Sequence, residues 1–321
     1  MIKPLIFSPY NFPQVLAEQP ISVSLTVDDG FNFADTSDFK VLLQVEPPEV
    51  KDLTDKIIEN HKFYDLILAW NTKILNTCPN ARLFFFACCS WLPWNSEGNN
   101  PNHARPQNGV PYTECDPSRK QFKASYLTSW KDWTPGHRLR QQIFDVLPES
   151  VGELSIAKHK SPPWIADKRD MLYDYQFTIS PLNASHDNWG DDKLSDPLIS
   201  KTIPLIWGCP NLSTYFNMDG IIHFQTIPEM MERLAALTPD YYAKHFDAVM
   251  DNFRRALAYT PIWTRVDKEI TEAIIRKGIK HEDSVDSSRP DGIRTRDRRP
   301  LRSQENQDNH SPVQRWRRRT N

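Results

Sequence analysis

Short apolar runs alternate with amphipathic stretches along most of the chain. Runs rich in Val, Ile, Leu and Phe predict buried β-strands, and they occupy residues 40–45, 65–70, 82–87, 125–130, 153–157, 175–180, 202–207 and 220–224. Amphipathic helices are predicted between several of them, including 136–147 and 191–200. Because strands and helices that alternate are typical of parallel sheets with helical crossovers, the pattern predicts an α/β fold.

Two further stretches depart from this alternation. Residues 93–124 are rich in Asn, Pro, Gly and Ser, which indicates a long surface excursion, either a plain insertion or a recognition loop. Residues 228–237, 239–259 and 264–277 are predicted as closing helices. Apolar residues recur there at helical spacing and should pack against the second sheet. These are Tyr242, Phe246, Met250 and Phe253.

Length and composition set the broad class. A chain of 321 residues can bury two cores, and a net charge of −2 gives no electrostatic reason to expect nucleic acid as a partner. No apolar run reaches the length of a membrane span, so no integral membrane segment is expected, and no targeting segment is visible. The five cysteines show no C-x-x-C spacing, which fits a reducing compartment, and the expected location is cytoplasmic.

The end of the chain has a different character. Residues 281–321 carry many Arg and acidic residues and almost no large apolar ones, which predicts a disordered basic tail. The cluster 315–319 could tether nucleic acid or anionic lipid. The run 292–297, GIRTRD, favours another reading, because its coding sequence would resemble the antisense strand of a transfer-RNA T-arm. On that hypothesis the tail is read-through without function.

Candidate chemistry gathers in residues 175–224. A predicted strand ends at residue 180, a polar loop follows, and a helix begins after Asp191, a plausible N-cap. In open α/β sheets, ligands bind beyond the carboxyl ends of strands, where helix N-termini meet phosphate. Lys193 in the first turn could neutralise a diphosphate, and the carboxylate of Asp192 could accept hydrogen bonds from ribose hydroxyls.

The same stretch resembles the donor motif of the α-1,3/1,4-fucosyltransferase family, glycosyltransferase family 10. The correspondence covers Asn183, Trp189, Asp192 and Lys193, and it continues through the segment IPLIWGCP and the residues YFN. The resemblance implies a GT-B fold, with two Rossmann-like domains and a cleft between them. It also implies that these four residues bind a GDP-sugar, Asp192 and Lys193 at its ribose and diphosphate.

Two more family positions can be sought outside this stretch. Arg140, with His137 and Arg138 close by, matches a phosphate-binding arginine, and a guanidinium suits a diphosphate. Glu46 follows a predicted strand and matches the family's general base, which would take the proton of the acceptor hydroxyl. For both, a solvated surface charge is the alternative interpretation.

The sequence also departs from the family pattern. Leu182 stands where the motif has a glutamate, and Asp192 is one methylene shorter than the family's Glu. The identity of the donor sugar is therefore open: GDP-fucose is the first choice and another GDP-sugar the second.

The resulting hypothesis is an inverting glycosyltransferase that moves a sugar to a glycan hydroxyl without a cofactor or metal. Its expected domains are 1–150 on the acceptor side, 151–280 for the GDP-sugar, and the tail 281–321. One alternative is a metal-dependent transferase that uses another nucleotide-sugar, with a manganese cluster at Asp187, Asp191 and Asp192. The other is a non-catalytic glycan- or nucleotide-binding protein.

Overall fold

Two mainly parallel sheets organise the chain. The structure is a computed structural model that describes residues 1–8, 16–87, 115–163, 165 and 168–278. Within these residues the strands form one five-stranded and one six-stranded sheet. The expected tail and residues 93–114 of the expected surface excursion lie outside the described residues. Residues 1–281 form one compact unit.

The first sheet is parallel throughout, in the order β1-β2-β3-β4-β5. Its strands are β1 (Leu5–Phe7), β2 (Val23–Val27), β3 (Phe39–Leu43), β4 (Leu66–Ala69) and β5 (Ala81–Leu83), and its helices are α1 (Thr54–Glu59) and α2 (Thr72–Thr77). Leu42 packs with α1 and α2, whereas its neighbours Val41 and Leu43 face a different cluster. Since both faces of β3 are buried, its sequence FKVLL is nearly continuously apolar.

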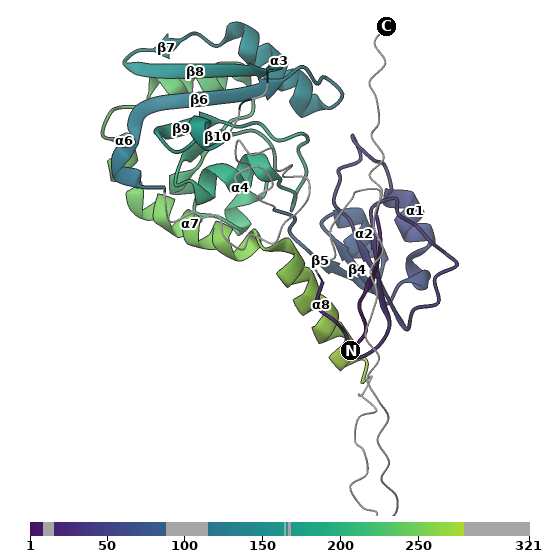
Figure 1. Cartoon of the computed structure of the whole chain (residues 1–321). Helices are drawn as coiled ribbons and strands as arrows, with labels where there is room; N and C mark the ends of the chain where they lie inside the picture. The colour runs from purple at the N-terminus through teal and green to yellow at the C-terminus, as the bar shows by residue number, and fades with distance from the viewer. Residues whose placement is uncertain (9–15, 88–114, 164, 166–167, 279–321) are drawn as a thin grey trace, which may run out of the picture. The chain divides into compact units, whose positions relative to one another are not determined.

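The second sheet has the order β11-β10-β9-β6-β8-β7, parallel except for the β7–β8 pair. Its strands are β6 (Gln121–Ser129), β7 (Ser150–Val151), β8 (Leu154–Ser161), β9 (Tyr175–Ile179), β10 (Ile203–Ile206) and β11 (Ile222–His223). Its helices are α3 (Pro135–Val146), α4 (Asp192–Ile199), α5 (Ile227–Ala235), α6 (Tyr241–Lys244) and α7 (Phe246–Tyr259). Figure 1 shows α7 running alongside α4.

Short 3-10 turns complete the described structure. They lie at His61–Phe63, Pro117–Arg119, Lys168–Met171, Leu212–Thr214 and Met218–Gly220. The predicted helix 239–259 is divided into α6 and α7 around His245. The expected packing is confirmed for Tyr242 and Phe246, which contact the core of the second sheet. Phe253 packs instead against the cluster that holds α4 and Trp189, and Met250 belongs to no apolar cluster of the described residues.

The last helix, α8 (Ile262–Arg276), packs on the first sheet. The sequence had suggested that the closing helices return to the nucleotide-binding half, and for α8 that expectation is wrong. Ile262, Val266 and Ile270 recur at helical spacing and pack against the apolar face of β2 and β3. Two ion pairs tie α8 and the residue after it to the same sheet, Arg82 with Glu269 and Lys277 with Asp65.

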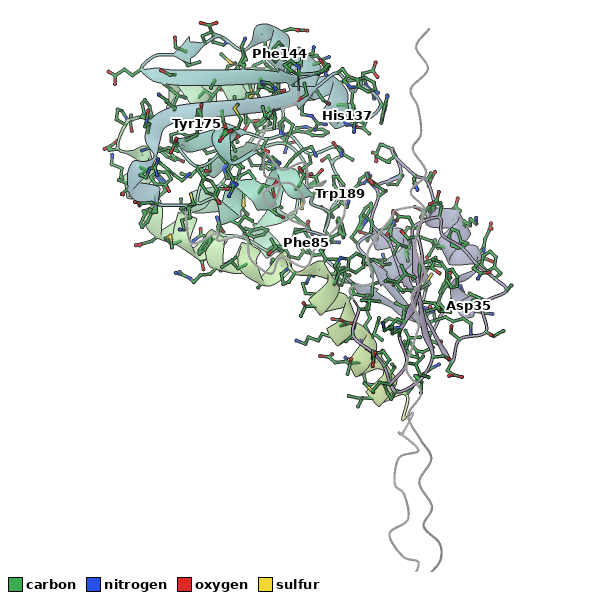
Figure 2. The ribbon with its side chains drawn as sticks, viewed as in Figure 1. Asp35, Phe85, His137, Phe144, Tyr175 and Trp189 are labelled. Atoms are coloured by element: carbon green, nitrogen blue, oxygen red, sulfur yellow. The ribbon has the colours of Figure 1, made fainter. Side chains whose placement is uncertain are left out.

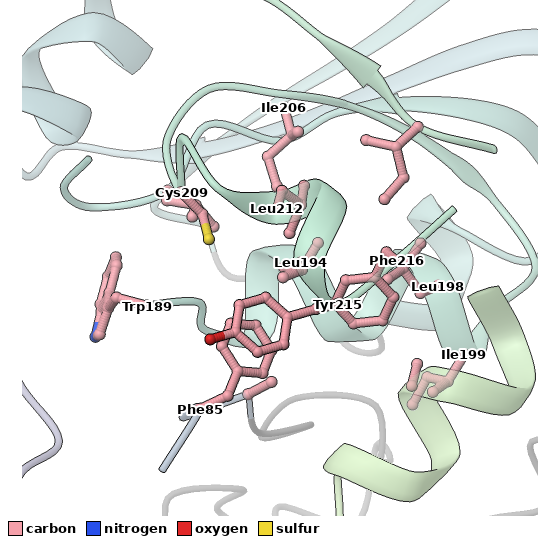
Figure 3. Close-up of a cluster of buried hydrophobic side chains, with 14 of the residues drawn as sticks. Phe85, Trp189, Leu194, Leu198, Ile199, Ile206, Cys209, Leu212, Tyr215 and Phe216 are labelled. Atoms are coloured by element: carbon pink, nitrogen blue, oxygen red, sulfur yellow. The ribbon is translucent and has the colours of Figure 1, made fainter. Parts of the chain in front are cut away.

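Another apolar cluster links the segment after β5 with the loops of the second sheet. The ring of Phe85 stacks on Tyr215, with centroids 4.0 Å apart and planes at 14° (Figure 3). Trp189 lies in the same cluster, and its indole N–H donates to the carbonyl of Val45 at 3.0 Å. An isolated parallel β-bridge also pairs Phe86 with Trp189.

These sheets confirm the predicted α/β class with two Rossmann-like halves, the architecture of the GT-B fold. The change from one sheet to the other falls between β5 and β6, earlier than the domain boundary expected near residue 150, so α3 belongs to the second sheet. The domain limits themselves stay a prediction. Among the helices of the described residues, none combines the length and apolar character needed to cross a bilayer.

Candidate functional site

A pocket of about 180 Å³ opens where β6 and β9 end and α4 begins. This is the edge at which the sequence placed the candidate chemistry. Both apolar and charged side chains line it. The charged and polar lining includes Ser129, Lys131, His137, Arg140, Lys168, Ser180, Asn183, Asp192 and Lys193, and the apolar lining includes Leu127, Ile165, Met171, Leu172, Ile179 and Pro197.

Lys193 is held at the N-terminus of α4 by two carboxylates. Asp191 caps the helix, as predicted, and accepts the backbone N–H of Lys193 at 2.9 Å. The Lys193 ammonium lies 3.0 Å from Asp191 Oδ2 and 3.1 Å from Asp192 Oδ1. Burial lowers the pKa of Lys193, but the two carboxylates outweigh it, so the pKa is raised overall. The side chain therefore stays charged, and 23% of it remains exposed.

Lys168 is a site residue that sequence reasoning missed. Its ammonium lies 2.9 Å from Asp192 Oδ2 and 2.6 Å from Asp196 Oδ2. Burial opposes the charged form of Lys168, yet Asp192 and Asp196 raise its pKa. Asp192 is buried as well, and the ammonium groups of Lys168 and Lys193 overcome the burial and lower its pKa. The two oxygens of Asp192 are thus fixed by different lysines.

Arg140 lines the pocket and holds the loop after β9. Its guanidinium donates to the carbonyl oxygens of Pro181 at 2.7 Å and Leu182 at 3.3 Å, and to Asn183 Oδ1 at 2.8 Å. Burial lowers the pKa of Arg140, partly offset by Asp191 and other groups. The structure therefore brings two of the expected donor-binding residues, Arg140 and Asn183, into direct contact.

The loop after β9 sits directly on the first turn of α3. Gly136 donates its N–H to the carbonyl of Asn183 at 3.0 Å. A Cβ at Gly136 would lie 1.8 Å from the carbonyl oxygen of Leu182, a backbone atom that cannot swing away. Only glycine allows this approach, which sets the spacing between α3 and the loop.

Gly136→Ala is therefore expected to lower the free energy of unfolding by about 1–3 kcal/mol, the usual cost of overpacking. Urea denaturation followed by circular dichroism measures the change. Gly152→Ala is the control for a glycine change at a place where a Cβ meets nothing within 4 Å, although its φ of +59° adds its own strain. Wild-type stability in Gly136→Ala would contradict the close approach.

His137 and Lys131 complete the polar wall of the pocket. Burial, and then the nearby charges of Arg140 and Lys193, lower the pKa of His137 to about 3, so its imidazole is neutral at physiological pH. His137 Nδ1 accepts the N–H of Thr134 in the capping box that begins α3. Figure 2 labels His137 on the ribbon. Burial also lowers the pKa of Lys131.

Two residues at motif positions, Leu182 and Trp189, lie outside the lining of the pocket. The side chain of Leu182 is fully buried in the apolar cluster that holds Trp189, so no carboxylate lies at the place of the motif glutamate. Trp189 is 2% exposed, packs near Trp70, and is absent from the lining of the pocket. In this structure both residues contribute to packing.

Glu46 lies just after β3, and it too is absent from the pocket lining. Its backbone N–H donates to the carboxylate of Asp28 at 3.2 Å, and its residue is partly exposed. Its charge is among those that raise the pKa of Lys131 against the larger effect of burial. Glu46 is therefore within electrostatic range of the pocket wall.

The three acidic residues proposed for the metal-dependent alternative do not all face the same hollow. Asp191 and Asp192 both pair with Lys193, whereas Asp187 is exposed and lines a separate hollow beside His186. Among the residues that the structure describes, no group of three His, Cys, Asp or Glu is placed to hold a metal ion.

Known proteins resemble this chain in sequence and in fold. No family model matches the sequence. The chain is 24% identical over 140 residues, 43% of its length, to α-(1,3)-fucosyltransferase FucT of Helicobacter pylori. The matched part spans 28% of that relative.

Solved structures that are similar to this chain include an α1,3-fucosyltransferase, with a TM-score of 0.47 and 15% identity over 84% of this chain and 91% of that chain. A second, an α1,3-fucosyltransferase with GDP-fucose, has a TM-score of 0.46 and 16% identity over 79% of this chain and 80% of that chain. The sequence match confirms the resemblance of this chain to the α-1,3/1,4-fucosyltransferase family.

Proposed function

We propose that the chain is an inverting glycosyltransferase that moves a sugar from a GDP-sugar, with fucose the first choice, to a hydroxyl of a glycan. The observation that carries the proposal is the pocket at the N-terminus of α4, where Lys193 and Asp192 lie side by side. The similarity to an α-(1,3)-fucosyltransferase supports it.

The pocket fits a nucleoside diphosphate. The N-terminus of α4 carries the positive end of the helix dipole, and Lys131 and Lys193 add positive charge to the same wall. A diphosphate entering here would compete with Asp191 for the ammonium of Lys193. Asp192, its oxygens fixed by Lys168 and Lys193, keeps lone pairs that can accept hydrogen bonds from ribose hydroxyls.

In the transfer step the protein must stabilise the leaving group and accept a proton from the acceptor hydroxyl. The bond between the anomeric carbon and the phosphate oxygen breaks, and GDP departs with the bonding electrons. Lys193 and the neighbouring cations stabilise the charge that develops on it. The acceptor hydroxyl attacks the anomeric carbon from the opposite face, which inverts its configuration, and Glu46 receives the hydroxyl proton.

The donor sugar is less constrained than the nucleotide. Because Leu182 is buried among apolar side chains, it offers no charge or hydrogen bond to a sugar. This observation keeps a second candidate function open, a protein that binds the nucleotide or a glycan without turnover. A donor comparison separates the two.

A donor screen is expected to give GDP release that depends on both a GDP-sugar and an acceptor. GDP-fucose and GDP-mannose would be compared, with lactose and N-acetyllactosamine as acceptors and buffer as the blank. Activity should persist in excess EDTA, since lysines rather than a metal would stabilise the leaving group. Glu46→Gln should bind GDP as the wild type does and lose transfer by a factor of about 100 or more.

Three results would contradict the proposal. GDP binding without release from any GDP-sugar would favour the non-catalytic alternative. Complete loss of activity in EDTA, restored by manganese, would favour the metal-dependent one. Full activity of Glu46→Gln would remove Glu46 from the role of base.

A further inference from the structure

The loop between β6 and α3 exposes two tryptophans. Trp130 is 55% exposed and Trp133 is 59% exposed. Tryptophan is seldom left in water to this extent, and an exposed aromatic pair on a protein surface commonly marks an interaction site. Both residues belong to the loop itself and to neither β6 nor α3.

Several hydrogen bonds fix the shape of this loop. Arg138 Nη1 donates to the carbonyl oxygens of Asp132 and Trp133, both at 3.2 Å. Gln141 Nε2 donates to the carbonyl of Lys131 at 3.1 Å and also to that of Ser129. The backbone of the loop is therefore tied to α3 on both sides of Trp130 and at Trp133, so little conformational entropy would be lost on binding.

The two indole rings form a corner at the rim of the pocket. Their centroids are 5.6 Å apart and their planes meet at 78°. Trp133 also meets the ring of His137 edge-on at 5.8 Å, and the ammonium of Lys131 lies 5.3 Å from its ring centre. His137 and Lys131 line the pocket, whereas the two tryptophans do not.

We propose that Trp130 and Trp133 form a stacking surface for a pyranose ring of the acceptor glycan. A pyranose has apolar C–H faces and a rim of hydroxyl groups. The C–H face suits the electron-rich face of an indole ring, and the ammonium of Lys131 can donate to a hydroxyl. This inference rests on the proposed function, because it takes the adjoining pocket as the donor site.

The position of Lys131 favours the acceptor over the donor as the occupant. Lys131 lies between the two tryptophans in the chain and lines the pocket, whereas Trp130 and Trp133 do not. The tryptophans therefore border the candidate donor pocket without forming part of it. A sugar stacked on them would lie beside a donor bound in the pocket, as an acceptor must.

The test compares Trp130→Ala, Trp133→Ala and the double variant with the wild type on an array of immobilised oligosaccharides. The array carries chains that end in galactose, glucose, mannose or N-acetylglucosamine. GDP binding is measured in parallel by calorimetry. Val146→Ala, at the other end of α3 and 56% exposed, is the matched control. We expect the double variant to lose glycan binding about tenfold or more, with the GDP dissociation constant unchanged.

Each contrary result has its own meaning. A wild type that binds no glycan, or a double variant that binds as the wild type does, would overturn the inference. A parallel loss of GDP affinity would place a nucleobase on the tryptophans, and binding of phosphatidylglycerol vesicles that only the double variant loses would place a membrane there. If the wild type binds glycans but no GDP, the proposed function fails instead.

Discussion

Lys193→Ala is expected to abolish sugar transfer while the chain stays folded. The side chain places a charged ammonium at the N-terminus of α4, where the departing GDP would develop negative charge. Removing one such group costs about 100- to 1,000-fold in turnover. The change should cost little stability, because 23% of the side chain is exposed and Asp192 keeps its bond to Lys168.

Release of GDP from the best donor measures the rate, and a thermal melt measures the fold. Lys73→Ala is the matched control, since this lysine also pairs with a carboxylate but lies 63% exposed on α2. Its activity should equal that of the wild type. Near-normal turnover in Lys193→Ala would remove Lys193 from the site, and a collapsed melt would show that its role is in folding.

Lys168→Met is expected to lower the free energy of unfolding by about 3–5 kcal/mol at neutral pH, the usual cost of removing one partner of a buried ion pair. The ammonium of Lys168 neutralises Asp192 and Asp196, whose side chains are 11% and 0% exposed. Methionine fills similar space but supplies no charge. Urea denaturation at several pH values measures the loss.

The loss of stability in Lys168→Met should be larger at neutral pH than at acidic pH. In the wild type, the lowered pKa of Asp192 contributes stability that is present above the ordinary carboxyl pKa of about 3.9 and is lost as the pH falls through the folded value. In Lys168→Met, Asp192 keeps only the ammonium of Lys193 as a partner, so burial raises its pKa relative to the wild type. The folded state then favours protonation, so the deficit of the variant should shrink between pH 7 and pH 5.

The variant Lys168→Met/Asp196→Asn supplies the control, because it removes one of the buried charges together with its partner. Part of the lost stability should return at neutral pH, and the pH dependence should weaken. A deficit that is the same at pH 5 and pH 7 would indicate lost packing and not lost charge pairing.

The parts of the site that the sequence predicted depend on local rules. Asp191 was predicted as an N-cap because its side chain type and its place before an amphipathic run are sufficient signals. Lys193 followed from the same register. Lys168 left no such signal, since it lies 24 residues before Asp192 in a 3-10 turn and meets it only in the tertiary structure.

The fold shows the same division. The strand β2 escaped prediction because Ser24 and Thr26 interrupt its apolar pattern, yet both are buried and Ser24 donates to Asp35. The amphipathic stripe of α8 was recognised, but a stripe does not say which sheet will cover it. The buried Leu182 was noticed as a departure, and only the structure assigned it to packing.

The placement of α8 has a consequence for how the protein is made. The first sheet occupies the beginning of the chain, but the helix that covers one of its faces is encoded near the end. Domains generally fold in order from the N-terminus during synthesis. Here one face of the first sheet stays uncovered until Val266 and Ile270 have left the ribosome. Completion of the first half must therefore wait for the second, and this long-range closure should make folding slow compared with a chain of two sequential domains.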